Sequence, residues 1–400
     1  MERIGFKASK ARFLSGLCYA IYVAVYDMAD DEGEIDPMLD IKADIARERL
    51  RHLSTSHENR ELSDDDLSSL LFRFDISSKD FYIPISKLPV LLQPTPALQF
   101  SSFKEIAHMT DGSNSNIYSA LLGETRVVIK MIKKDMISDQ IAMLEFDSEA
   151  ELLCRVSHPH IIKLLGRGTS PRKFLVLEYL SGGSLSSRQN IIQSTHGASA
   201  PILRKPTYTY EQLLLLMQDI ASAMNYLHTR HNGVGAGIIH RDLKPDNIGF
   251  SDDGVLKLFD FGLSTVVRKT KKSSEVYEMS GTTGSLRYMA PEVVLNKPYN
   301  EKVDVYSFGI MCWQMASDRL PFKGMSKDQF LNVIVMGKQR PKLDASWPSG
   351  FRHLLQSCWH DDHQKRPSFS FVLDDISVLI RNFRLESRAR ALETSADYVI

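Results

Sequence analysis

The sequence predicts an α+β fold of two lobes, a small strand-rich lobe followed by a larger helical lobe, with an N-terminal extension. Strand-like apolar runs dominate between about residue 103 and residue 180, and long helical patterns follow them. The chain has 400 residues, which exceeds one typical domain. A strand-rich unit followed by a helical unit predicts two lobes with a cleft between them.

The first 100 residues form a separate region, either an interaction module or an extension packed on the following lobes. Residues 13–26 follow a basic start and are too short to span a bilayer, so they indicate a buried helix or strand, with targeting or anchoring as the alternative. Ser63 fits the N-cap of a helix. The proline-spaced residues 83–98 indicate a linker or an extended segment.

The elements of the two lobes follow from periodicity and from turn residues. Polar residues rich in Ser, Gly and Pro at 186–208 indicate a mobile insertion at the lobe junction. The predicted strands are residues 125–132 and 173–180, and the predicted helices are residues 142–156, 210–230, 301–317 and 351–360.

Composition excludes several classes of protein. The apolar and charged fractions, 43% and 24%, are those of an ordinary globular protein, and the formal net charge is zero. This gives no support for a nucleic-acid partner or a polybasic membrane protein. The four cysteines form no CxxC pair, which indicates reduced thiols. A cytoplasmic location is expected, with a nuclear location and N-terminal targeting as alternatives.

Two polar motifs lie among apolar strand-like runs in "IIHRDLKPDNIGFSDDGVLKLFDFGLS", residues 238–264. Side chains such as Asp242, Asn247 and Asp260 are costly to bury together unless a cation lies between them. Oxygen ligands suit Mg²⁺, so Asn247 and Asp260 are candidate metal ligands. Asp242 is then available to orient a hydroxyl for phosphoryl transfer, and Lys244 can neutralise the moving group.

Residues 103–382 resemble a eukaryotic protein kinase, which leaves residues 383–400 as a C-terminal tail. The resemblance rests on an ordered set of motifs at family spacing. The set consists of Lys130 in a strand, Glu149 in a helix, HRDLKPDN at 240–247, DFG at 260–262, APE at 290–292 and KRPSF at 365–369. It implies the bilobal protein-kinase fold.

The resemblance also implies roles for individual residues. Lys130 holds the nucleotide phosphates and pairs with Glu149, and Asp242 is the catalytic base. Glu292 pairs with Arg366, and Asp304 ties the catalytic loop to the helical lobe. Leu177 is the gatekeeper, and the backbone of Glu178 and Leu180 binds adenine. The implied nucleotide-binding set is Gly112, Ile117, Val128, Lys130, Leu177, Glu178 and Leu180, with ATP and Mg²⁺ as cofactors.

Several segments are similar to the tyrosine-kinase-like group of serine/threonine kinases, among them GTTGSLRYMAPEV and CWHDDHQKRPSF. Lys244 occupies the position typical of serine/threonine kinases, and Ser285 matches the family's hydroxyl beside the substrate. The resemblance implies protein substrates with serine or threonine acceptors, with dual or tyrosine specificity as the alternative. It also implies control by phosphorylation of the segment 264–285, with Thr282 or Thr283 as the modified residue and Arg241 as the phosphate ligand.

The nucleotide site departs from the family pattern in two places. Only Gly112 remains of the three glycines expected in the loop TDGSNSNIY, where Thr110 and Ser115 replace the others. In the adenine slot Val128 replaces an alanine, and Gly249 replaces a bulky residue. We expect either that the larger roof compensates for the smaller floor, or that Phe250 fills the gap.

Three functions compete on these observations. The intact catalytic residues favour an active, Mg²⁺-dependent protein kinase. The poor glycine loop and the altered slot favour a pseudokinase scaffold. A small-molecule kinase of related fold is disfavoured by APE and KRPSF, which belong to a peptide-substrate surface. A protein partner of the N-terminal region is a further expectation, based on its acidic bias.

Overall fold

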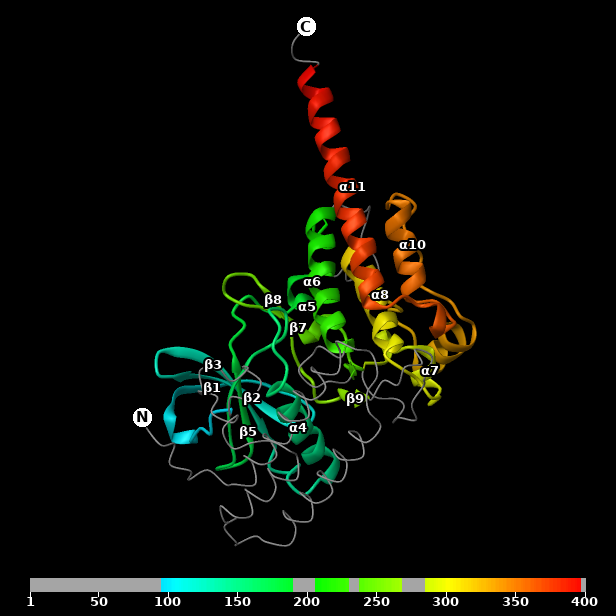
Figure 1. The fold of residues 1–400 in the computed structure, drawn as a ribbon. Coiled ribbons are helices and arrows are strands. Elements are labelled where there is room, and N and C mark those ends of the chain that lie inside the picture. Colours follow the sequence, from blue (N-terminus) through cyan, green and yellow to red (C-terminus); the bar gives the residue numbers. More distant parts are fainter. Residues whose placement is uncertain (1–94, 190–205, 230–236, 268–284, 397–400) are drawn as a thin grey trace, which may run out of the picture. The chain divides into compact units, whose positions relative to one another are not determined.

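A strand-rich part precedes a mainly helical part along the residues that the structure describes, which are 95–189, 206–229, 237–267 and 285–396 of a computed structural model (Figure 1). The chain divides into one unit at Met1–Pro94 and a second at Thr95–Ile400. The predictions for residues 13–26, for the Ser63 helix and for most of the proline-spaced run lie outside the described residues. The second unit is described below.

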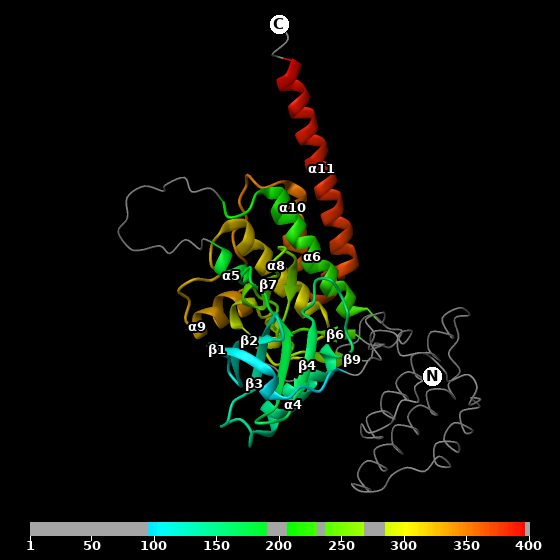
Figure 2. The same cartoon turned by 90° about the vertical axis from the view of Figure 1, so that its left-hand side faces the viewer.

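The small lobe is a five-stranded antiparallel sheet with helix α4 beside it (Figure 2). Its strand order is β1-β2-β3-β5-β4. A short 3₁₀ turn at Phe100–Ser102 leads into it. The elements are β1 (Phe103–Asp111), β2 (Ser115–Leu122), β3 (Thr125–Ile132), α4 (Gln140–Leu153), β4 (Leu164–Gly168) and β5 (Phe174–Glu178).

The alternating pattern of β3 divides its side chains between two environments, because successive side chains of a strand point to opposite faces. Val127, Ile129 and Met131 are buried in the core of the small lobe. Val128 and Lys130 therefore lie on the other face. In the register of the sheet Ile117 pairs with Lys130, and Leu177 pairs with Val128. One face of the sheet thus gathers four of the predicted nucleotide-site residues.

Helix α4 is positioned by its cap and by its apolar face. The Asp139 carboxylate accepts hydrogen bonds from the backbone N–H groups of Ile141 and Ala142 at 2.9 and 3.0 Å, which fixes the start of the helix. Phe146 and Ala150 pack against Leu175 of β5 and the end of β3. Glu149 lies on the adjacent side of the helix and is buried.

The large lobe is built around α6 and α8, which share one core with α5, α7, α10 and α11. A capping box between Thr209 and Gln212 starts α6. Most side chains of α8 are buried, as expected for a central helix. The helices are α5 (Leu185–Arg188), α6 (Tyr210–His228), α7 (Pro291–Val294), α8 (Lys302–Ser317), α9 (Lys327–Phe330), α10 (Ser349–Cys358) and α11 (Phe369–Ala396), with a π-helical segment at Leu331–Met336.

Two short antiparallel strand pairs and several 3₁₀ turns carry the polar motifs into this lobe. One pair is β6 (Gly237–Ile239) with β9 (Thr265–Val267), and the other is β7 (Ile248–Phe250) with β8 (Leu256–Leu258). HRD follows β6 and DFG follows β8. The 3₁₀ turns are Pro245–Asn247, Leu286–Tyr288 and His363–Lys365.

The α+β fold of two lobes is confirmed, and the strand at 125–132 has the predicted bounds. The first residues of the predicted insertion, up to Arg188, are helical in α5, and residues 190–205 lie outside the description. Helix α11 continues through residue 382, where we ended the predicted kinase domain, to Ala396. Among the described residues, no helix has the length and apolar character that crossing a membrane requires.

Candidate active site

Lys130 joins three parts of the fold in one ionic cluster. Its Nζ donates to both carboxylate oxygens of Glu149, at 2.9 and 2.7 Å, and to Oδ1 of Asp260 at 2.9 Å. These residues come from β3, from α4 and from the segment after β8. The structure therefore brings together three residues that the sequence places up to 130 positions apart.

The Lys130 charge stabilises the carboxylates around it, although burial, followed by the Asp260 charge, still raises the pKa of Glu149. Burial alone would lower the pKa of Lys130, but the carboxylates of Glu149 and Asp260 outweigh burial and raise it. The Lys130 charge in turn holds the pKa of Asp260 below its ordinary value. Asp260 has a φ of +65°, which is uncommon for a residue other than glycine and marks a strained position.

Asp242 accepts hydrogen bonds on both carboxylate oxygens. Its Oδ2 accepts from Lys244 Nζ at 2.6 Å, and its Oδ1 accepts from the backbone N–H of Ser285 at 2.8 Å. Lys244 also donates to the Ser285 hydroxyl at 2.8 Å. The carboxylate is buried, so these contacts fix its orientation. The predicted base, the predicted cation and the predicted hydroxyl lie in contact.

Asn247 lies beside Asp242 and has a fixed amide orientation. Its Nδ2 donates to the backbone carbonyl of Asp242 at 2.8 Å and to the Asp242 side chain at 3.1 Å. Because both donors are used, the amide oxygen is directed away from Asp242 and can serve as a cation ligand.

The donor set fits Mg²⁺ held jointly with a nucleotide. Asn247 and Asp260 offer oxygen, and Mg²⁺ is commonly held by one or two such side chains together with substrate phosphates. Within the described ranges, no cluster of three or more His, Cys, Asp or Glu side chains is arranged to hold a metal.

Asp304 of α8 fixes the HRD turn through hydrogen bonds to its backbone. Its carboxylate accepts from the backbone N–H groups of His240 and Arg241 at 2.8 Å each, and it contacts His228 Nε2 at 2.8 Å. Burial alone would raise the pKa of Asp304, but its contacts with His228 and His240 outweigh burial and lower it. The His240 ring packs edge-on against Phe261 of DFG, with ring centroids 5.0 Å apart. These residues position the two motifs, as predicted.

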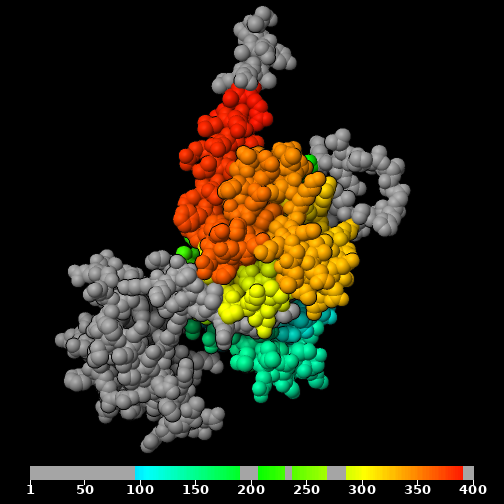
Figure 3. Space-filling model, turned by 90° about the vertical axis from the view of Figure 1, so that its right-hand side faces the viewer, coloured from blue at the N-terminus to red at the C-terminus, as the bar shows by residue number. Residues whose placement is uncertain are grey.

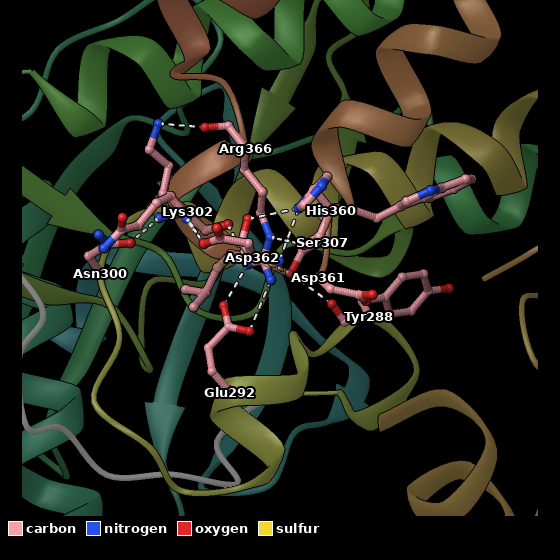
Figure 4. A network of polar contacts seen from close by, with 12 residues as sticks. Tyr288, Glu292, Asn300, Lys302, Ser307, His360, Asp361, Asp362 and Arg366 are labelled. Atoms are coloured by element: carbon pink, nitrogen blue, oxygen red, sulfur yellow. Dashed lines mark hydrogen bonds and ion pairs between the residues drawn. The ribbon is translucent and has the colours of Figure 1, made fainter. Parts of the chain in front are cut away.

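A second buried ion pair anchors the APE segment (Figure 4). Arg366 is buried and donates through Nη1 and Nη2 to the two carboxylate oxygens of Glu292, at 2.5 and 3.0 Å. Its remaining donors reach backbone carbonyls of His360 and Lys302. The bidentate geometry fixes α7 against the loop before α11.

A further residue, Leu180, enters the floor of the adenine slot beside Gly249. A Cβ placed on Gly249 would lie 2.5 Å from Cδ1 of Leu180 and 3.2 Å from Cε1 of Phe259. The side chain of Leu180 therefore fills the space that Gly249 leaves. The Phe250 ring is buried under Arg188, whose guanidinium carbon lies 3.7 Å from the ring centroid, on the opposite face of β7 from Gly249. Sequence reasoning assigned only the backbone of Leu180, and no local signal pointed to its side chain.

The predicted adenine-binding backbone lies in the hinge at Glu178 and Leu180. The Glu178 N–H donates to the carbonyl of Lys163 at 3.2 Å. Leu177, the predicted gatekeeper, is buried in β5.

The loop between β1 and β2 is a tight turn held by side chains. The Gly112 N–H donates to the carbonyl of Ser115 at 2.8 Å, and Asn116 donates to Asp111 at 2.6 Å. At the tip, Asn114 Nδ2 donates to Glu145 of α4 at 3.1 Å. This link to α4 was not predictable, because nothing in the sequence of either segment indicates the contact.

The predicted regulatory residues are described in part. Arg241 has a φ of +67°, and its guanidinium donates to the carbonyl of Leu263 and to the hydroxyl of Tyr299. Thr282 and Thr283 lie outside the described residues.

Comparison with known proteins gives one family over this region. The sequence model of the family "protein tyrosine and serine/threonine kinase" matches residues 103–376. The chain is 34% identical over 278 residues to a probable serine/threonine-protein kinase of Dictyostelium discoideum, which covers 69% of this chain and 28% of that protein. It is also 34% identical over 268 residues to a serine/threonine/tyrosine-protein kinase of Arabidopsis thaliana, which covers 66% of this chain and 62% of that protein.

A dual specificity protein kinase of Dictyostelium discoideum is likewise 34% identical over 270 residues, which cover 67% of this chain and 35% of that protein. The chain thus spans less than two thirds of the length of each of these curated relatives.

Proposed function

Because this chain belongs to the protein tyrosine and serine/threonine kinase family, we propose that it is an active kinase that transfers the γ-phosphoryl group of ATP to serine or threonine hydroxyls of proteins. The acceptor preference is supported by Lys244 and Ser285, which lie in contact beside Asp242. Among the relatives, one is named a serine/threonine/tyrosine kinase and another a dual specificity kinase, so tyrosine phosphorylation is the second candidate activity.

The observation that carries the proposal is the cluster of Lys130, Glu149 and Asp260. Phosphoryl transfer in protein kinases requires the strand lysine paired with the helix glutamate and the DFG aspartate in place. Here both carboxylates lie within 2.9 Å of one ammonium group. A scaffold that has lost catalysis has no need of this costly buried arrangement.

Each residue of the site has a separate role in the proposed reaction. Lys130 binds nucleotide phosphates, and Asn247 with Asp260 would hold Mg²⁺. When bound, Mg²⁺ supplies neutralisation of the phosphate charge. Asp242 accepts the hydrogen bond of the acceptor hydroxyl and orients it, and Lys244 stabilises negative charge beside it. We further propose that phosphorylation of Thr282 or Thr283 controls the site, with Arg241 as the phosphate ligand.

The test separates binding from catalysis with two matched substitutions. Asp242→Asn should retain Mg²⁺-ATP affinity in calorimetry and lose phosphoryl transfer by about 10²-fold or more. Asp260→Asn should weaken Mg²⁺-ATP binding itself. Asp328→Asn, an exposed aspartate on α9, is the control and should change neither quantity. Near-normal transfer by either site variant would refute the assignment, and a wild-type chain that binds no ATP would favour the scaffold. Phosphoamino acid analysis of a labelled substrate decides between the two acceptor classes.

A further inference from the structure

We propose that Asn114 is a positioning residue of the nucleotide site, and that its hydrogen bond to Glu145 holds the loop between β1 and β2 closed against α4. The inference rests on the proposed function, because it concerns the loop that covers the nucleotide phosphates in protein kinases. The contact joins the tip of that loop to the helix that carries Glu149, the partner of Lys130.

Asn114 is held through both its backbone and its side chain. Its carbonyl accepts a hydrogen bond at 2.9 Å from the N–H of Lys133, the residue directly after β3. Its Nδ2 donates to Oε2 of Glu145 at 3.1 Å. A loop displaced away from these partners would lose both contacts, so Asn114 connects the position of the loop to β3 and to α4.

Glu145 is a suitable acceptor because its side chain is half-buried and lies close to the charges of the active site. Burial raises the pKa of Glu145 above its ordinary value, against the positive charge of Arg241, and the charges of Asp260 and Lys130 also act on it in opposite directions. Within the described residues, Asn114 is the one hydrogen-bond donor to this carboxylate. A hydrogen bond to an ionised, partly buried carboxylate is stronger than one between neutral groups.

The loop benefits from such a contact because its sequence departs from the family pattern. Glycine lets a backbone approach phosphate closely, and Thr110 and Ser115 occupy two positions where glycines are expected. A backbone with fewer glycines has less freedom to close around a nucleotide after it binds. The contact to α4 instead fixes the loop before binding, and this preorganisation lowers the ordering cost of binding.

The same contact makes loop closure depend on the position of α4, which lies at the surface of the small lobe (Figure 3). Glu145 and Glu149 are four residues apart and therefore project from the same side of the helix. Glu149 pairs with Lys130 at 2.7 Å. When α4 is in place for this ion pair, the acceptor for Asn114 is in place as well, so one position of the helix serves both catalysis and nucleotide retention.

Removal of either partner should weaken nucleotide retention without slowing the chemical step. Asn114→Ala and Glu145→Ala should each raise the KM for ATP, and the dissociation rate of a fluorescent ATP analogue bound with Mg²⁺, by about tenfold, which corresponds to about 1.4 kcal/mol. The kcat at saturating ATP should change by less than about threefold, because the contact is present in both the substrate complex and the transition state. A merely structural role would instead lower kcat through loss of folded protein and leave KM unchanged.

A double-mutant cycle tests whether the two residues act through one contact. The variant with both alanine substitutions should be no weaker than either single variant, since both changes remove the same hydrogen bond. Glu145→Gln keeps an oxygen acceptor on a side chain of the same length, and should retain KM within about threefold of wild type. Glu151→Ala removes an exposed carboxylate further along α4, and as the matched control it should change neither KM nor the dissociation rate.

The outcomes separate this inference from the proposed function. In an active wild-type kinase, an unchanged KM in both alanine variants would overturn the role of Asn114, as would effects of the two substitutions that simply add. A wild-type chain that neither binds Mg²⁺-ATP nor transfers phosphate would refute the proposed function and this inference with it. Thermal unfolding of each variant verifies that the small lobe stays folded.

Discussion

Substitution of Gly249 by leucine tests whether the side chain of Leu180 forms the floor of the adenine slot. In Gly249→Leu the new side chain starts from a Cβ that lies 2.5 Å from Leu180 Cδ1. Carbon atoms in favourable contact are about 3.5 to 4.0 Å apart, so the overlap is about 1 Å at this atom alone. Overpacking of this kind costs about 1–3 kcal/mol. Because Leu180 belongs to the hinge, it has to move toward the nucleotide, and Mg²⁺-ATP affinity should fall by about tenfold, or about 1.4 kcal/mol.

A second substitution shows which residue compensates for the missing side chain at Gly249, Leu180 or Val128. Leu180→Ala added to Gly249→Leu conserves volume, and should restore affinity to within a few-fold of wild type. Val128→Ala added to Gly249→Leu widens the roof and leaves the Leu180 contact in place, so affinity should stay near that of the single variant. Rescue by Val128→Ala would instead support the compensation between roof and floor that the sequence led us to expect.

Calorimetry with Mg²⁺-ATP on the wild type and the variants measures these effects, with thermal unfolding as the control for folding. Rescue by Val128→Ala in place of Leu180→Ala would refute the reasoning. So would simple additivity of Gly249→Leu and Leu180→Ala, because residues in contact are expected to couple.

Three further predictions follow from buried and half-buried charges. Lys130→Met should abolish phosphoryl transfer and, by leaving buried Glu149 unpaired, lower the unfolding free energy by about 3–5 kcal/mol, measured by urea titration. Arg366→Met should destabilise by a similar amount because Glu292 loses its bidentate partner, and adding Glu292→Met should recover part of that loss in the same titration. Burial lowers the pKa of His158 to about 4, so the unfolded chain binds the proton more readily. Stability should therefore fall as pH drops from above 6.5 toward 4, and the urea midpoints of His158→Gln should show a smaller fall.

The parts of the site that the sequence predicted are those in which a residue type and its chain spacing determine the chemistry. Lys130 was placed on a strand by the apolar alternation around it, and the sheet register then aims its side chain at the slot. Asp242 and Asn247 lie five residues apart in one turn, so their contact was accessible from the sequence.

Contacts between distant segments were not accessible in this way. Leu180 meets Gly249 across 69 positions of chain, and the choice between neighbouring apolar side chains for one gap depends on packing that no local pattern encodes.

The loop between β1 and β2 keeps a defined turn although two of its expected glycines are absent. Glycine permits a backbone to turn sharply and to approach phosphate, and two of the expected glycines are absent. The turn is nevertheless closed by the Gly112 to Ser115 hydrogen bond, and Asn114 fastens its tip to Glu145 on the helix that also carries Glu149. The position of the loop is thus coupled to the position of α4, the helix that carries the Glu149 partner of Lys130. In both places where the chain departs from the family pattern, the loop and the slot floor, a side chain outside the motif takes over a structural role. The missing motif residues alone are therefore a weak argument for a scaffold that has lost catalysis.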